Sequence, residues 1–578
     1  MAEQKNPPPS TMAVAGAPEI ESEQQPAESN THETPAAIEQ LDMETPEAES
    51  SPPPVRSKRR IAAIMTALYL VLFITALDQT IIATSIPTIS ASLNSAAGYT
   101  WIGSAYLLAT AAAGPIWARI SDIFGRKPAL LLSVTAFAAA SILAALSTSM
   151  RMLIAARALQ GAGGGGLIQM VYITISDLFS VRRRALWFGL LGLMWAVAGS
   201  TGPLVGGGLT EKVSWRWCFW INLPVCGVAL VLLVLCLDVH DPRTKLRDGV
   251  VAIDWLGTLA IVGLTLMLLL GMEFGGSAVF PWSSAKVICL LVFGVVMVAV
   301  FVVTEKKVAR YPLIPMNLFT SGPTNAAFIL AFAHGMVSFG TEYYLPLYFQ
   351  SVKQASPLRS GILILPMMVT EATTDILTGI VIHRIGRYRE ITWIGTVLMA
   401  LGTGLYISLA RETSIGVIFA FQIVAGIGTA MLFQTPVLAI QSSVTRAADT
   451  ASGTAALALT RNIATSFSIV IGGVVFSDGM NRRRGELVAA GLDTGLLEKL
   501  AGNRAAANVD VVKVIVDQAQ KLAVRDAFAW SIRNMFIFYT GIAGVAVLAG
   551  VFIKQKDMKR EHTETKTGIA ELAMREEA

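Results

Sequence analysis

Apolar runs alternate with short polar segments along most of this chain. Each run is close to the roughly 20 residues that a helix needs to cross a bilayer. The pattern predicts fourteen membrane-spanning helices, near residues 61–84, 101–118, 128–148, 152–176, 186–208, 216–237, 254–273, 285–304, 323–349, 358–381, 391–410, 414–440, 454–477 and 532–553. An even number of spans returns the C-terminus to the side of the membrane on which the N-terminus lies.

The basic residues between the runs predict the orientation. Short loops rich in Lys and Arg stay in the cytoplasm. Every second short segment carries such a group, which predicts that both termini are cytoplasmic. The groups are Arg119/Arg126/Lys127, Arg182/Arg183/Arg184, Arg243/Lys245/Arg247, Lys306/Lys307/Arg310, Arg384/Arg387/Arg389, Arg446 alone, and Lys554/Lys556/Lys559/Arg560 after the last run.

Composition agrees with a membrane protein. The chain has 578 residues, of which 53% are hydrophobic and only 15% are charged. Soluble domains carry about 25% charged residues, so an ordinary soluble enzyme, a nucleic-acid module and a disulfide scaffold are excluded. Residues 1–55 hold eleven acids, one lysine and no aromatic residue, which predicts a disordered acidic cytoplasmic tail. The four cysteines lie within apolar runs and show no metal-binding spacing.

One long segment, residues 478–531, is predicted to be a loop on the outer side. It begins with three arginines, Arg482 to Arg484, which long loops tolerate because they translocate largely regardless of charge. Within it, Val512, Ile515, Ala519 and Leu522 recur at helical spacing. We therefore expect a helix there that packs against the protein, with a position on the membrane surface as the alternative.

Two charged residues inside predicted spans are candidates for proton coupling. Ionisable groups within a bilayer are costly and are functional candidates by default. Asp78 lies late in the first run, where a low dielectric favours the neutral form of a carboxyl group and suits reversible proton uptake. Arg157, a few residues inside the fourth run, is the expected partner because a guanidinium stays charged. The alternative is a structural role for both, as a lock between helices.

Three acids in the second half are candidates for a substrate cavity. Glu371 and Asp375 are four residues apart and therefore share one helix face, and Glu342 precedes Tyr343 in an aromatic segment. Such carboxyl groups suit a second proton site or contact with a cationic substrate. A water-filled vestibule in which they have no role is the alternative. Gln160, next to Arg157, is included among the cavity candidates together with Glu342, Tyr343, Glu371 and Asp375.

Five motifs in order give the chain a resemblance to the major facilitator superfamily. Residues 121–127 (SDIFGRK) resemble its signature loop, Arg157 to Gly161 its motif in helix four, and residues 202–207 (GPLVGG) its antiporter motif in helix five. Residues 77–87 (LDQTIIATSIP) and 215–224 (WRWCFWINLP) look like the drug:proton antiporter family with 14 spanning helices. Within that family, the long loop before the last helix is similar to that of fungal toxin and drug efflux pumps.

The resemblance implies an all-α integral membrane protein with two six-helix bundles and one inserted helix pair. The expected parts are residues 56–237, 238–322 with the inserted pair, 323–553 and a cytoplasmic tail at 554–578. A cytoplasmic gate is expected at Asp122, Gly125, Arg126 and Lys127. Close helix packing is expected at the antiport-motif residues and in helix four. The packing residues are Gly161, Gly202, Pro203, Gly206 and Gly207.

The function expected from these features is proton-coupled export of a small amphipathic compound such as a secondary metabolite, toxin or drug. The bundles would rock around a midplane site. The expected partners are substrate, protons and lipid, without nucleic acid, and the expected state is a monomer in the plasma membrane. No enzyme activity, cofactor or metal is expected, because the loops carry no metal cluster or nucleophile constellation. The sequence also has no nucleotide-binding P-loop, which argues against direct coupling to ATP. The alternatives are a vacuolar carrier of basic amino acids or siderophores, and a non-transporting membrane sensor.

Overall fold

The computed structural model describes residues 57–558, except positions 83, 94–97, 277–279, 445–448, 503 and 510, together with residues 567–576. The predicted acidic tail and the basic residues Arg446, Lys559 and Arg560 lie outside the described residues. Throughout the described part the regular structure is helical, and no strand occurs there.

Fourteen long helices follow the fourteen predicted runs in the same order. They are α1 (Lys58–Ile81), α3 (Gly98–Phe124), α4 (Arg126–Ala145), α5 (Met150–Leu178), α6 (Val181–Lys212), the pair α7 (Trp217–Trp220) and α8 (Asn222–Cys236), α10 (Trp255–Gly276), α11 (Ala285–Lys307), α12 (Gly322–Ser351), α13 (Pro357–Ile385), α14 (Arg389–Leu405) with η2 (Tyr406–Ser408), α15 (Ile415–Ser443), α16 (Asp449–Arg482) and α21 (Gln518–Val551). Among the described residues, eleven of these spans are long and apolar enough to cross a membrane. The other three, α3, α5 and α12, have 27, 29 and 30 residues.

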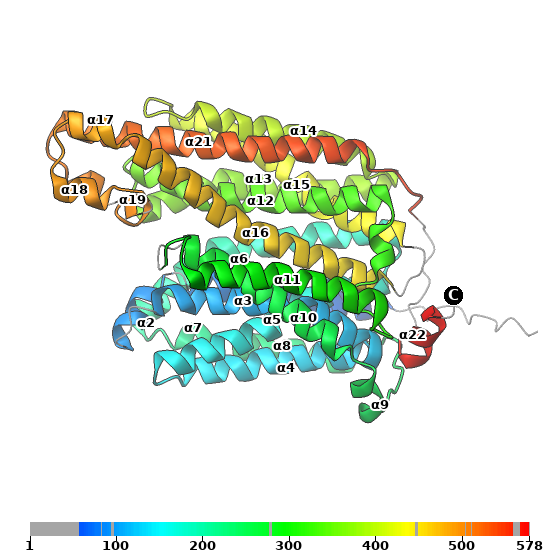
Figure 1. Cartoon of the computed structure of the whole chain (residues 1–578). Helices are drawn as coiled ribbons and strands as arrows, with labels where there is room; N and C mark the ends of the chain where they lie inside the picture. The colour runs from blue at the N-terminus through cyan, green and yellow to red at the C-terminus, as the bar shows by residue number, and fades with distance from the viewer. Residues whose placement is uncertain are drawn as a thin grey trace, which may run out of the picture. The chain divides into compact units, whose positions relative to one another are not determined.

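Short helices connect the long ones. They are α2 (Ile86–Ser92), α9 (Leu246–Val251), η1 (Met316–Phe319), α17 (Arg484–Ala489), α18 (Thr494–Lys499), α19 (Arg504–Ala507), α20 (Val511–Val514) and α22 (Ile569–Glu576). In Figure 1 the long helices run side by side, with α17 to α19 at one end and α9 and α22 at the other. The end that carries the α3–α4 turn at Gly125 is called the α3–α4 end below.

Local sequence explains where several long helices begin and end. Serine side chains cap α5, α13 and α15 by accepting a hydrogen bond from a free backbone N–H group of the first turn. Gly386 ends α13 with a positive φ of 71°, which a residue without Cβ adopts without strain. These caps define where each apolar helix ends and the polar connection to the next helix begins.

The predicted loop at 478–531 is shorter than expected. Helix α21 begins at Gln518 rather than near residue 532, because Asp517 caps it and its first turns bury Val524 and Phe528. Its charged residues, such as Lys521 and Arg525, lower the hydropathy of this stretch. The position of the apolar run therefore does not indicate where the helix begins.

The helix predicted within that loop is not continuous. Val512 lies in α20, Leu522 lies in α21, and the chain is non-helical from Ile515 to Asp517. Val512 and Ile515 are nevertheless buried, in a cluster with residues of α12, α16 and α21. The segment therefore packs against the protein, as expected, but as the short helix α20 and the first turns of the long helix α21.

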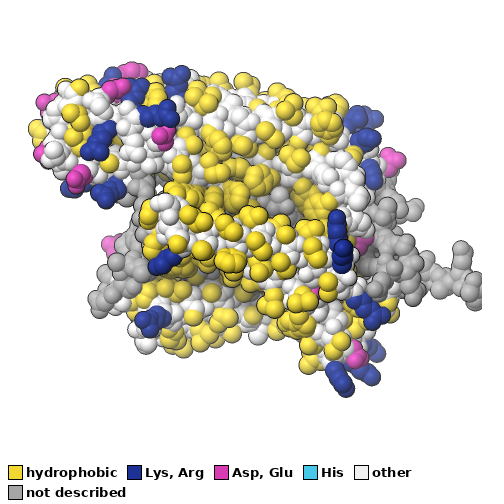
Figure 2. Space-filling view, in the orientation of Figure 1, with side chains coloured by type: hydrophobic (Ala, Val, Ile, Leu, Met, Phe, Trp, Pro, Cys, Tyr) yellow, Lys and Arg dark blue, Asp and Glu magenta, His cyan; other side chains and the backbone are white. Residues whose placement is uncertain are grey.

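The helices of the two halves meet mainly along two pairs. Helix α6 packs against α13, and α3 packs against α16. Helix α10 contacts both α3 and α16, whereas α11 packs mainly on α10. Large apolar side chains such as Val292, Phe293 and Val295 of α11 are exposed. Figure 2 shows hydrophobic side chains covering the flanks of the helices, with most Lys and Arg side chains towards their ends. That distribution suits a bilayer around the middle of the helices.

Candidate functional site

Asp78 and Arg157 form an ion pair deep inside the first half. Their side chains are 0% and 1% exposed, and Nη1 of Arg157 lies 2.5 Å from Oδ2 of Asp78. The second oxygen of Asp78, Oδ1, accepts hydrogen bonds from Nε2 of Gln160 at 2.8 Å and Nδ2 of Asn222 at 2.9 Å. The charge on this carboxylate is thus balanced by one guanidinium and two amide donors.

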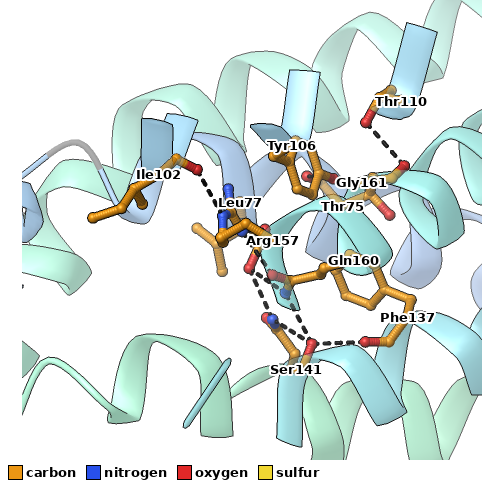
Figure 3. A network of polar contacts seen from close by, with 12 residues as sticks. Thr75, Leu77, Ile102, Tyr106, Thr110, Phe137, Ser141, Arg157, Gln160 and Gly161 are labelled. Carbon is orange, nitrogen blue, oxygen red and sulfur yellow. Dashed lines mark hydrogen bonds and ion pairs between the residues drawn. The ribbon is translucent and has the colours of Figure 1, made fainter. Parts of the chain in front are cut away.

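The same polar groups also bind each other (Figure 3). Arg157 donates to Oε1 of Gln160 at 2.7 Å, and both Gln160 and Asn222 donate to the hydroxyl of Ser141. Ser141 in turn donates to the carbonyl oxygen of Phe137, one turn earlier in α4. The network therefore joins α1, α4, α5 and α8. A change in the charge of Asp78 would alter the hydrogen bonds that connect all four helices.

Aromatic rings and a backbone carbonyl hold the guanidinium in place. The Arg157 guanidinium carbon lies 4.4 Å from the centre of the Tyr106 ring and 5.9 Å from that of Phe219. Its Nε donates to the carbonyl oxygen of Ile102 at 3.1 Å. Rings of this kind attract a desolvated cation, so the arginine has a fixed position that does not depend on Asp78 alone.

Two members of this network were not predicted from the sequence. They are Asn222, within the motif at 215–224, and Ser141, within the run at 128–148. Both are fully buried. An asparagine inside a predicted span is a signal that could have found the first, because an amide in a bilayer needs partners. Ser141 gave no such signal, since a serine hydroxyl can bond to its own helix.

The residues of the expected gate converge at the α3–α4 turn. Arg126 donates to Asp122 and Ser121 through Nη1 and to Asp177 of α5 through Nε, each at 2.6 Å. Arg126 and Asp122 are buried. Gly125 has φ +93°, and a Cβ there would lie 2.8 Å from Cδ of Pro242. Lys127 points away from this group and donates to the carbonyl oxygen of Val234 at 2.8 Å.

Three of the four expected packing glycines permit close approach of helices. A Cβ at Gly161 would overlap the carbonyl of Tyr106 in α3, and one at Gly202 or Gly206 would overlap α1 at Thr80 or Ile81. Gly207 differs, because no described atom lies within 4 Å of the place that its Cβ would occupy. Pro203 is exposed. In this conformation the packing therefore rests on Gly161, Gly202 and Gly206.

The acids of the second half occupy a different place from the Asp78 network. Oε1 of Glu371 accepts a hydrogen bond from Thr429 at 2.7 Å, and Oε1 of Glu342 accepts one from Ser338 at 3.3 Å. Both acids are half-buried, and Tyr343 is 57% exposed. Gln160, which the sequence analysis grouped with them, instead bonds to Asp78, Arg157 and Ser141.

Asp375 lies at the contact between the two halves. Its Oδ1 accepts a hydrogen bond from Gln434 at 2.8 Å, whereas Oδ2 is buried without a hydrogen-bond partner among the described residues. A Cβ at Gly192 of α6 would overlap this Oδ2. Arg461 of α16 is half-buried, and its guanidinium carbon lies 4.8 Å from the centre of the Phe433 ring. Arg461 was not predicted as a site residue, although an arginine within the predicted span 454–477 is a signal that could have found it.

Helices α6 and α13 approach closely towards the α3–α4 end. There a Cβ at Gly379 of α13 would overlap the carbonyl oxygen of Ala185 in α6, and Arg182 donates to the carbonyl oxygen of His383 at 2.7 Å. Farther along, Gly199 of α6 and Gly361 of α13 have no described atom within 4 Å of a Cβ position. The two halves are thus in close contact at the α3–α4 end along this pair.

Comparison with known proteins identifies the family of this arrangement. Residues 68–469 match the family model described as Major Facilitator Superfamily. The chain belongs to the major facilitator superfamily. It is therefore a multi-pass membrane transport protein rather than an enzyme, and the predicted family and fold class are confirmed.

Several curated members of the superfamily are similar over most of the chain. The MFS-type transporter ppz2 of Metarhizium majus is 43% identical over 523 residues, which are 90% of each chain. The efflux pump dotC of Dothistroma septosporum is 42% identical over 509 residues, 88% of this chain and 87% of the other. The efflux pump FUS6 of Gibberella fujikuroi is 36% identical over 75% of this chain and 78% of the other.

Solved structures of the superfamily share the fold. The human organic anion transporter MFSD10 gives a TM-score of 0.54 at 14% identity, covering 85% of this chain and 99% of the other. The proton:xylose symporter XylE gives 0.53 at 14% identity, covering 90% and 99%. At this identity the likeness concerns the arrangement of the helices and not the cargo.

Proposed function

We propose that this chain is an efflux transporter that exchanges protons for a small amphipathic organic compound, such as a secondary metabolite, toxin or drug. The observation that carries the proposal is the buried Asp78–Arg157 ion pair, whose second carboxylate oxygen is held by two amides. The similarity to dotC and FUS6, which are named as efflux pumps, supports the direction of transport.

The chemistry of the pair suits proton exchange. A proton that binds Asp78 neutralises the carboxylate and removes most of the attraction that holds Arg157 at 2.5 Å. Because Gln160, Asn222 and Ser141 bond to the same groups, the loss is transmitted to α4 and α8. Protonation and a rearrangement of the first half are therefore linked, and a substrate that favours the ionised arrangement competes with the proton.

The energy for export would come from the proton gradient. One proton that moves across 100 mV supplies about 2.3 kcal/mol, before any pH difference is added. No ATP is required. The basic side chains near the α3–α4 end, such as Arg183 and Arg184, favour a cytoplasmic position for that end. The structure then corresponds to a state closed towards the cytoplasm, with Asp122, Arg126 and Asp177 as the gate, and the plasma membrane as the proposed location.

The proposed cargo site lies between the halves near Glu342, Glu371, Asp375 and Tyr343. Half-buried carboxyl groups beside an exposed tyrosine offer hydrogen-bond acceptors and an aromatic surface to an amphipathic compound. The three acids also favour a second candidate, a carrier of cationic cargo such as basic amino acids in the vacuolar membrane. Cationic and neutral probes distinguish the two.

Transport by yeast cells that produce the protein tests the proposal. Cells are loaded with ethidium as a cationic probe or with a neutral coumarin dye, and retained fluorescence is measured at external pH 5. We expect less dye in producing cells than in cells with the empty vector, and loss of this difference after addition of a protonophore. Export that continues after the gradient has collapsed would contradict proton coupling, and lysine uptake into vacuoles without dye export would favour the second candidate.

A further inference from the structure

The C-terminal segment, residues 567–576, contacts the turn between α3 and α4. The backbone N–H of Gly568 donates to the carbonyl oxygen of Asp122 at 2.8 Å. Leu572 of α22 is 2% exposed and packs with Ile123 and Tyr311. This contact lies at the end where α22 appears in Figure 1. A segment more than 400 positions away in the sequence thus covers the residue that bonds to Arg126.

The segment is also bonded to the connection that follows α8. Nε2 of His240 donates to the carbonyl oxygen of Thr567 at 3.2 Å. Pro242 lies between two glycines with positive φ, Gly125 at +93° and Gly568 at +117°, and a Cβ on either would come within 2.8 Å of its ring. Such close approach from both sides requires glycine and indicates a specific fit rather than a chance contact.

The docked segment contacts three parts of the chain at this end, namely the α3–α4 turn, the connection after α8 and, at Tyr311, the connection after α11. The turn contains Asp122 and precedes Arg126, which holds Asp177 of α5. Thr244 of the connection after α8 donates to the carbonyl oxygen of Ile123, in the same turn. A displacement of the turn from this connection would break the contacts of Gly568, Thr567 and Leu572 together.

We propose that residues 567–576 form a regulatory segment that docks on the α3–α4 turn and stabilises the closed arrangement of this end. Release of the segment then favours opening, so the C-terminus sets how readily the transporter changes conformation. The surface that receives it consists of Ile123, Phe124 and Tyr311, with Ala252 and Ile253 at its margin. The inference goes beyond the proposed function, because it concerns docking and shape and requires no proton coupling.

Maleimide labelling of single cysteines tests the docking in the full-length protein. Cys236 and Cys289 are first replaced by serine, which leaves the buried Cys218 and Cys226. Leu572→Cys and Ala570→Cys are then compared, since Leu572 is buried and Ala570, two residues earlier in α22, is exposed. We expect Ala570→Cys to react at least about tenfold faster, because a population ratio of ten needs only ~1.4 kcal/mol. Equal rates would overturn the docking.

A second reporter tests the effect on the closed end. Ser176 of α5 is buried and accepts a hydrogen bond from Gln441 of α15 in the other half. In the same background, a cysteine in the Ser176→Cys variant reacts only when this end opens. Leu572→Asp, or removal of residues 567–578, is expected to raise its labelling rate several-fold, whereas Ala570→Asp leaves the rate unchanged. An unchanged rate in both the Leu572→Asp and the truncated protein would overturn the regulatory role. Neither readout involves transport, so failure of the proposed function would not affect them.

Discussion

Asp78→Asn is expected to abolish concentrative export while leaving the protein folded. Asparagine keeps the shape of the side chain but cannot bind and release a proton. With one proton exchanged for each neutral cargo molecule, 100 mV supplies about 2.3 kcal/mol, which sustains a cargo ratio of about 50. In vesicles with an imposed potential, we expect this ratio to fall to about 1 in the variant. The measurement is the accumulation of an exported dye.

The control for this prediction is the same change at an exposed carboxylate. Asp526 of α21 is more than half exposed and pairs with Arg411 at 3.3 Å. Exposed ion pairs contribute little to stability, so Asp526→Asn should transport like the original protein. Concentrative export that survives in Asp78→Asn would show that the coupling proton binds elsewhere, with Asp375 and Glu371 as the next residues to test.

Gly206→Ala is expected to destabilise the protein, whereas Gly207→Ala, at the adjacent position, is not. A methyl group at Gly206 would overlap the carbonyl oxygen of Ile81, which lies about one turn after Asp78 in α1. A methyl group at Gly207 would have no described atom within 4 Å. Overpacking of this kind costs about 1–3 kcal/mol. In a helix without such a clash, alanine is favoured over glycine by up to about 1 kcal/mol.

Thermal unfolding of the purified variants in detergent checks this pair. We expect a lower midpoint for Gly206→Ala and an unchanged or slightly higher midpoint for Gly207→Ala. Gly202→Ala should behave like Gly206→Ala, because its Cβ would overlap Thr80. Equal midpoints for the two adjacent variants would contradict the close approach of α1 and α6 on which the geometry around Asp78 depends.

The fold could be predicted largely from the order of apolar runs. In lipid the backbone N–H and C=O groups must be hydrogen-bonded within the segment, so each apolar run that spans the bilayer forms a helix. The prediction was less exact where polar residues enter a long helix. Helix α21 begins at Gln518, within the predicted loop, since its charged first turns pack on protein rather than on lipid. Hydropathy measures how readily a residue leaves water, and it does not predict which protein side chains will pack against that residue.

Only part of the site could be predicted, because the sequence does not show which polar residues meet in the folded protein. Asp78 and Arg157 stand out as charges within apolar runs, and the structure brings them together. Asn222 and Ser141 are neutral, and their separations of 144 and 63 positions from Asp78 give no local sign of contact. The open surroundings of Gly207 could not be predicted either, because they depend on which face of α6 packs against α1.

Proton movement by the purified protein is the most direct test of the claim that Asp78 carries the coupling proton. The protein is reconstituted into vesicles that contain a pH-sensitive dye, and an exported compound is added on one side without any imposed pH gradient. The account predicts a change of internal pH that depends on the compound in the original protein and in Asp526→Asn, and none in Asp78→Asn. A pH change of the original size in Asp78→Asn would contradict it.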